Sequence, residues 1–168
     1  MSIQSEKHEL YAQFGIAAEK AQTLETAAAN FVLTYLGLLF EPGKITPDQR
    51  EFLRSIVDDI NHKTLGSILK NLKELATFDQ TFIATVEEAL ERRNYLTHHF
   101  FRSHNFAIYS EEGRRVMIEE LRNIQEEFCR AVAMLSAASG SLQGFTELPR
   151  VTEEQIQKLV AEGRRIEI

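Results

Sequence analysis

The side chains best suited to proton transfer and to phosphate binding gather in one window of thirteen residues. The window contains Arg92, Arg93, His98, His99, Arg102 and His104. An imidazole exchanges its proton near neutral pH, and a guanidinium offers a phosphate a planar fork of donors. The net charge of −6 disfavours a protein that coats nucleic acid by bulk charge. A polyanion would therefore have to be bound locally, at this basic window.

Arg93 interrupts the apolar stripe of a predicted helix. If Val86 is the centre of that stripe and each residue advances by about 100°, Arg93 lies about 20° from the centre. The other residues beside the centre are Phe82, Leu90, Thr97 and Phe100. A charge in mid-stripe conflicts with the local pattern, and such conflicts concentrate at functional sites or at interfaces that supply a partner charge.

Asn94, His98 and Arg102 form a polar ridge beside this stripe, because they follow one another at intervals of four residues. Arg93 and His98 are five residues apart, so on an ideal helix they point about 140° away from each other. One copy of the helix does not bring both side chains to one phosphate. A homodimer with this helix at its seam brings two copies of the motif together across a two-fold axis.

A structural reading of the same residues stands beside the chemical one. Histidines in the last turn of a helix interact favourably with its macrodipole, and Arg93 is able to pair with a buried carboxylate from another helix. His99 points away from the stripe and is predicted to lie at the surface. His104 is predicted to be a loop residue.

The elements that must position these side chains are helices. Apolar residues recur at steps of three and four, the helical period, over residues 6–40, 46–60, 65–75, 79–101 and 110–140. The chain shows neither strand-like alternation nor internal repeats. The sequence predicts an all-α fold: an antiparallel bundle of four or five helices in a domain over residues 1–145, with a C-terminal appendage helix over residues 146–168.

Capping and breaker residues mark the ends of these helices. Thr46-Pro47 supplies an N-cap followed by a proline at the first helical position, and Thr77 with Gln80 forms a capping box. Ser110 is predicted to open the last long helix. The other predicted boundaries are a break near Asn61-His62, a closing pair at Gly140 and Gly144, and the start of the appendage helix at Thr152.

The composition fits a single domain in a reducing compartment. The 168 residues are 43% hydrophobic and 26% charged, which is a globular balance. Cys129 is the only cysteine, which excludes an intramolecular disulfide framework and a multi-cysteine zinc site. The first ten residues lack the apolar core of a secretory signal, and the apolar run over residues 31–40 is far shorter than the ~20 residues that span a bilayer. We expect a cytoplasmic protein without a membrane partner.

Motifs of metal and cofactor chemistry are missing from the sequence. There is no zincin HExxH and no phosphate-cradling P-loop, and Asp59-x-x-His62 is an incomplete match to the paired Glu-x-x-His motifs of di-iron bundles. We expect neither a cofactor nor a metal site.

Residues 91–101 resemble the signature of HEPN domains, in which an arginine, a polar residue, three variable residues and a histidine lie late in a helix of an α-helical bundle. Here these positions are Arg93, Asn94, Tyr95-Leu96-Thr97 and His98. The likeness covers roughly residues 63–142. It implies a dimeric, metal-independent endoribonuclease, and many members of the family serve as toxins or antiviral effectors.

Under this resemblance Arg93, Asn94 and His98 are the catalytic residues. His98 would act as base or acid, Arg93 would hold the phosphate, and Asn94 would orient the histidine or the phosphate through hydrogen bonds. The candidate substrate-binding residues are Arg102, Tyr95 and Arg92. Tyr95 or the Phe100-Phe101 pair are further candidates to stack on a base, although core packing is the commoner use of such aromatics.

One position departs from a branch of the family that carries a tyrosine two residues after the histidine, where a partner nucleotidyltransferase modifies it. This chain has Phe100 there, so we do not expect that regulation. Some members lack nuclease activity. The sequence thus supports two hypotheses: a homodimeric ribonuclease restrained by an antitoxin or regulatory protein, and a non-catalytic helical regulatory or protein-interaction module.

Overall fold

The described part of the chain is helical. The computed structural model describes residues 3–38, 46–48, 50–51, 54–55 and 79–143. Its elements are α1 (Ile3–Leu38), α4 (Gln80–His98), α5 (Phe100–Ser103), the 3₁₀ turn η1 (Ala107–Tyr109) and α6 (Glu111–Gln143). These residue ranges contain no strand, and the predicted all-α fold is confirmed.

Several predicted boundaries fall at the margin of the described residues. The Arg50 amide donates to the Thr46 carbonyl at 3.0 Å, as expected for a helix that begins after Thr46. Other predictions lie outside the described residues, namely the break near Asn61-His62, the stretch over 65–75, the Thr77 cap, the closing Gly144, the helix over 146–168 and the boundary at 145/146.

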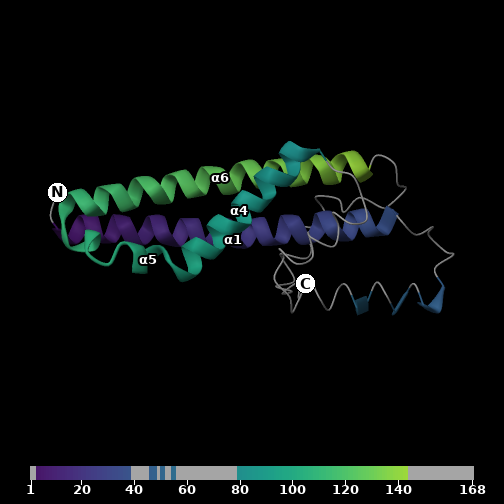
Figure 1. Cartoon of the computed structure of the whole chain (residues 1–168), viewed down its shortest axis with the longest axis horizontal. Helices are drawn as coiled ribbons and strands as arrows, with labels where there is room; N and C mark the ends of the chain where they lie inside the picture. Colours follow the sequence, from purple (N-terminus) through teal and green to yellow (C-terminus); the bar gives the residue numbers. More distant parts are fainter. Residues whose placement is uncertain (1–2, 39–45, 49, 52–53, 56–78, 144–168) are drawn as a thin grey trace, which may run out of the picture.

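Helices α1 and α6 lie side by side and run in the same direction (Figure 1). The Gln125 amide donates to the Gln13 side-chain oxygen at 2.9 Å, and further along both helices Lys20 Nζ lies 3.0 Å from Cys129 Sγ. Small side chains on α1, among them Ala21, allow this close approach. This pair consists of the first and the fifth of the five predicted helices, which run in the same direction when successive helices of a bundle alternate.

Helix α4 crosses this pair obliquely and runs opposite to it (Figure 1). Near its start the Phe82 ring lies 5.2 Å from Phe31, late in α1. Just beyond its end, in α5, the Phe101 ring lies 4.8 Å from Phe14, early in α1. The antiparallel prediction holds for α4 against α1, and the late residues of α4 are carried toward the early part of α1.

The core lies between the three long helices and follows the predicted stripes closely. Its fully buried side chains include Leu10, Ala17, Leu24, Phe31, Phe100, Met117, Leu121, Ile124, Phe128 and Leu135.

The prediction of which α4 residues face the core was wrong at one position. Thr97, expected beside the stripe, is exposed and donates to the Arg93 carbonyl at 3.0 Å, while Leu96 is buried. The Thr97 hydroxyl is satisfied by a carbonyl of its own helix, so this polar side chain can lie at the surface.

The predicted helix over residues 79–101 is divided at His99. Asp79 is its N-cap, accepting from the amides of Thr81 and Phe82 at 2.9 and 3.2 Å. Helix α4 ends at His98, His99 has φ −125° and ψ −25°, and α5 begins at Phe100. The regular helix is therefore interrupted directly after the predicted catalytic histidine.

The two glycines of α6, Gly113 and Gly140, lie in different surroundings. Ser110 caps the helix by accepting from the Gly113 amide at 3.0 Å, as predicted for its start. A Cβ on Gly113 would overlap the carbonyl oxygen of Ala107, so the absence of a side chain lets η1 pack on the first turn. Gly140 was predicted to close the helix, but it lies inside α6, which continues to Gln143.

We predict that Gly113→Ala lowers the free energy of unfolding by about 1–3 kcal/mol, because backbone atoms of η1 must move to admit the methyl group. The measurement is the urea midpoint at unchanged slope. Gly140→Ala is the matched control, since a Cβ there meets no atom within 4 Å, and it should gain about 0.5–1 kcal/mol. Equal midpoints for the two variants would contradict the packing of η1 on α6.

Candidate functional site

The predicted catalytic residues lie along the last two turns of α4. Arg93 is partly buried, whereas Asn94 and His98 are exposed, and His98 is the last residue of the helix. Arg102 follows in α5 and is exposed. Within the described residues Arg102 forms no ion pair, so its guanidinium faces solvent close after the motif helix.

Arg93 is held from two sides. Its Nη2 forms an ion pair with Glu25 of α1, and its Nη1 donates to Asn94 Oδ1 at 2.9 Å. The side chains of Arg93 and Glu25 are 30% and 37% exposed. The partner charge anticipated for a mid-stripe arginine is therefore present, but the pair lies at the edge of the core rather than inside it.

This exposure limits the contribution of the pair to stability. We predict that Arg93→Met changes the free energy of unfolding by at most about 1 kcal/mol, because solvent screens a pair that is one-third exposed. The urea midpoint measures it, with Arg92→Met as the control that breaks another partly exposed pair one residue away. A loss of about 3–5 kcal/mol would identify Arg93 as the anchor of a buried ion pair instead.

Arg92, predicted to bind substrate, faces α6. Its Nε donates to Glu127 at 3.1 Å. It lines a hollow of about 480 Å³ whose other ionisable residues are Glu119, Glu120, Glu126, Glu127 and Arg130. Four carboxylates against two guanidinium groups disfavour a phosphate, so the structure separates Arg92 from Arg93 both in direction and in electrostatic surroundings.

His98 and His99 are both exposed, and their rings lie 6.4 Å apart in an edge-to-face arrangement. The surface position predicted for His99 is confirmed. His98 is the last residue of α4 and His99 is its C-cap. Both side chains are exposed, so exposure does not distinguish the two histidines. Any difference in their roles must come from what each ring faces in a complex.

A polar cluster joins the end of the motif helix to α6, and sequence reasoning missed it. His104 Nε2 lies 2.6 Å from Glu120 Oε2 and 3.5 Å from the Tyr95 hydroxyl, and the His104 ring packs 4.9 Å from that of Phe100. Burial, together with a hydrogen bond to Glu120, raises the pKa of the Tyr95 phenol above 10.0, and a hydrogen bond with Ser103 partly offsets the rise. His104 was predicted to be a loop residue. Its contact with Glu120 also joins the segment after α5 to α6.

The aromatic residues of the motif serve mainly as core. Phe100 is fully buried, and Phe101 packs on Phe14 and on Tyr11, with the Tyr11 ring centroid 6.1 Å away. Tyr95 is partly buried by the cluster described above. Because Phe100 is fully buried, it cannot stack on a base in this conformation. It packs in the core, which was the alternative prediction for these aromatics.

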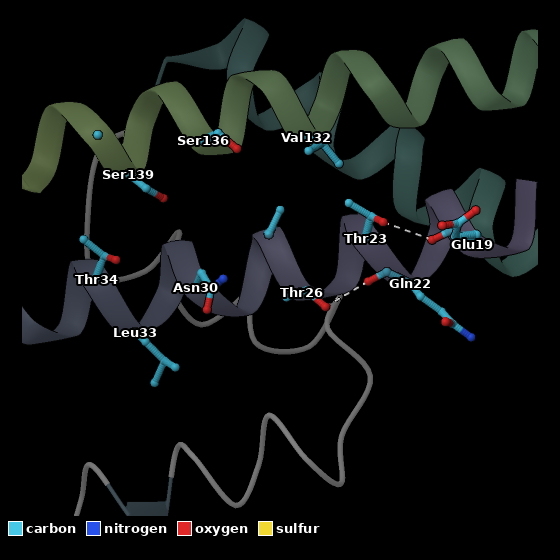
Figure 2. A pocket seen from close by; sticks show the side chains of 12 residues that line it. Glu19, Gln22, Thr23, Thr26, Asn30, Leu33, Thr34, Val132, Ser136 and Ser139 are labelled. Atoms are coloured by element: carbon cyan, nitrogen blue, oxygen red, sulfur yellow. Dashed lines mark hydrogen bonds between the residues drawn. The ribbon is translucent and has the colours of Figure 1, made fainter. Parts of the chain in front are cut away.

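A larger hollow than that beside Arg92 lies elsewhere in the described structure. It has a volume of about 730 Å³ between the later halves of α1 and α6, and includes none of the motif residues. Figure 2 shows the short polar side chains that line it, among them Thr23, Thr26, Asn30, Ser136 and Ser139. Thr23 and Thr26 donate to carbonyls of their own helix at 3.1 Å, so these hydroxyls are already engaged and do not form a set of donors aimed at a ligand.

The described residues form neither a metal site nor a membrane span. No three of their His, Cys, Asp and Glu side chains gather closely enough to hold a metal ion. None of the helices they form is both long and apolar enough to cross a membrane. The single cysteine, Cys129, is an exposed free thiol.

Comparison with protein-family models, with curated proteins and with solved structures finds no match for this chain.

Proposed function

We propose that this protein is a metal-independent endoribonuclease of the HEPN type that acts as a homodimer. One observation carries the proposal: a partly exposed arginine, its hydrogen-bonded Asn94 neighbour and an exposed histidine end the same helix, with the exposed Arg102 directly after them. Arg93, Asn94 and His98 thus combine a phosphate-binding group with a proton-transfer group on a solvent-facing ridge. The cytoplasm is the proposed compartment.

The proposed reaction needs only these groups. The His98 imidazole takes the proton of a ribose 2′-hydroxyl, whose oxygen attacks the adjacent phosphorus. The bond from phosphorus to the 5′-oxygen breaks, and a protonated imidazole supplies the proton of the new 5′-hydroxyl. Arg93 stabilises the charge that builds up on the phosphorane oxygens. The products are a 2′,3′-cyclic phosphate end and a 5′-hydroxyl end.

A second copy of the chain is part of this proposal. Five residues separate Arg93 from His98, so the two side chains diverge on one helix, and an imidazole from each protomer would divide the acid and base roles. We predict a homodimer by light scattering at micromolar concentration. A strict monomer with full cleavage activity would contradict the composite site.

The experiment that tests the activity is incubation of purified protein with mixed RNA in excess EDTA. The expected products carry 2′,3′-cyclic phosphate ends. Such ends block labelling at the 3′ end and resist alkaline phosphatase until mild acid or a cyclic phosphodiesterase opens the ring to a phosphomonoester. Cleavage that EDTA abolishes would point to a metal-dependent nuclease and would refute this mechanism. Protection of RNA in cells by a co-expressed partner would identify the antitoxin or regulator of a toxin or antiviral effector.

A second function is favoured by a different observation. The η1 turn is fixed by Gly113 and by the Arg114 side chain, which donates to the Ile108 carbonyl at 3.1 Å. Phe106, just before the turn, and Tyr109, its last residue, are nevertheless 83% and 80% exposed. Large aromatics displayed on a rigid turn are typical of protein interfaces. A non-catalytic interaction module would keep partner binding in His98→Ala and lose it in Phe106→Ala.

A further inference from the structure

The ion pair between α1 and the motif helix places an anion on the arginine assigned to phosphate. Glu25 follows the fully buried Leu24, which fixes this part of α1 in the core, and its carboxylate reaches Arg93 Nη2. On the other side the Asn94 side-chain oxygen accepts from Nη1 at 2.9 Å. The guanidinium of Arg93 is therefore already coordinated within the free protein.

A carboxylate and a phosphodiester are similar ligands for a guanidinium. Each carries one negative charge and presents two oxygens that accept parallel hydrogen bonds from the planar fork. Asn94 contributes a neutral oxygen, so Glu25 is the group that competes by charge. A phosphate that takes up the bidentate position on Arg93 has to displace Glu25 or share the guanidinium with it.

The Arg93–Glu25 ion pair is weak enough for a phosphate to displace Glu25. Both side chains are about one-third exposed, and such pairs contribute little because solvent screens them. Other carboxylates of α1 and α6 pair with other arginines, among them Glu6 with Arg114, Glu9 with Arg122 and Glu127 with Arg92.

We propose that Glu25 is an internal competitor for the phosphate site, occupying Arg93 in the free protein and lowering its affinity for the RNA backbone until a phosphate displaces it. This inference rests on the proposed function. It assigns to α1 a regulatory part in a site whose other residues come from α4 and α5, and it makes the affinity for RNA depend on a contact within the protomer.

The test measures binding separately from cleavage. The probe is a fluorescently labelled 2′-O-methyl RNA oligonucleotide, which has the phosphates but no free 2′-hydroxyl, and its anisotropy gives Kd at low salt for the full chain. Glu25→Gln is expected to bind the probe about two- to five-fold more tightly than wild type. Glu19→Gln, an exposed position of the same helix, removes the same charge and should change Kd by less than that.

The Arg93→Met background completes the cycle. There Glu25→Gln should behave as Glu19→Gln does, because the group it competes for is gone. Tightening by Glu25→Gln that is no greater than by Glu19→Gln, or that persists without Arg93, overturns the inference while leaving the nuclease proposal intact. Wild-type binding that does not depend on Arg93 overturns the assignment of the phosphate site itself. Glu25→Asp, whose shorter side chain reaches less far, provides a second variant and should also tighten binding.

Discussion

The His98→Ala protein should cleave RNA about 10²–10⁴-fold more slowly than wild type, the range over which a positioned proton-transfer group acts. Its fold should be unaffected, because His98 is exposed at the last residue of α4 and its described contact is the ring of His99. The measurement is the single-turnover cleavage rate at saturating protein, read beside the urea midpoint.

His99→Ala is the matched control for this prediction. The two histidines are adjacent and both exposed, so general effects of losing an imidazole at this surface appear in both variants. We expect His99→Ala to retain the wild-type rate within a few-fold. A loss confined to His99→Ala would move the proton-transfer role to the residue at the helix break, and wild-type rates in both variants would exclude both.

Arg114→Met should lower the free energy of unfolding by about 3–5 kcal/mol, since it leaves a buried carboxylate without its partner. Arg114 and Glu6 are 3% and 10% exposed, and the guanidinium contacts Glu6 Oε2 through Nη2 at 2.6 Å and through Nε at 3.1 Å. Its Nη1 also holds the Ile108 carbonyl. One side chain thus joins the start of α1, the η1 turn and the start of α6.

The controls for this prediction separate burial from charge. Arg115→Met removes a neighbouring guanidinium that pairs with Glu111 at the exposed surface of the same helix, and should cost less than about 0.5 kcal/mol. The double variant Glu6→Leu with Arg114→Met removes both buried charges and should recover part of the loss. A cost for Arg114→Met as small as that for Arg115→Met would mean that the pair is hydrated in solution.

The stripes of α1 and α6 were readable from the sequence because burial repeats with the helical period. Most of the stripe residues are buried, while Phe14, Tyr35 and Val132 are partly buried. The criterion that selected Arg93 also selects Arg114, which precedes Met117 by three residues and so continues its stripe, and Glu6, which precedes Leu10 by four. The helical period of the sequence therefore also places Arg114 and Glu6 on buried faces, although neither residue was among the predicted site residues.

Other features had no local signal. The pairing of Glu25 with Arg93 and of Glu120 with His104 depends on which helix faces lie opposite each other, and this is set by packing between distant segments. The break at His99 was also not evident, since the residues around it keep a helical pattern. The chemistry of the candidate site could be proposed from residue types, but the contacts that hold and restrain it required the three-dimensional arrangement.

The parallel pairing of α1 with α6 has a consequence for biosynthesis. Glu6 and Arg114 are 108 positions apart in the chain, so at the usual rates of translation the partner of α1 is made roughly 5–20 s after α1 itself. During that interval the apolar face around Leu10 and Leu24 has no α6 to cover it, whereas α4 and α6 are close in sequence and come together soon after they are made. Contacts of such high sequence separation also slow folding. Among the described helices, α1 is therefore the one whose apolar face waits longest for the partner it has in the folded protein.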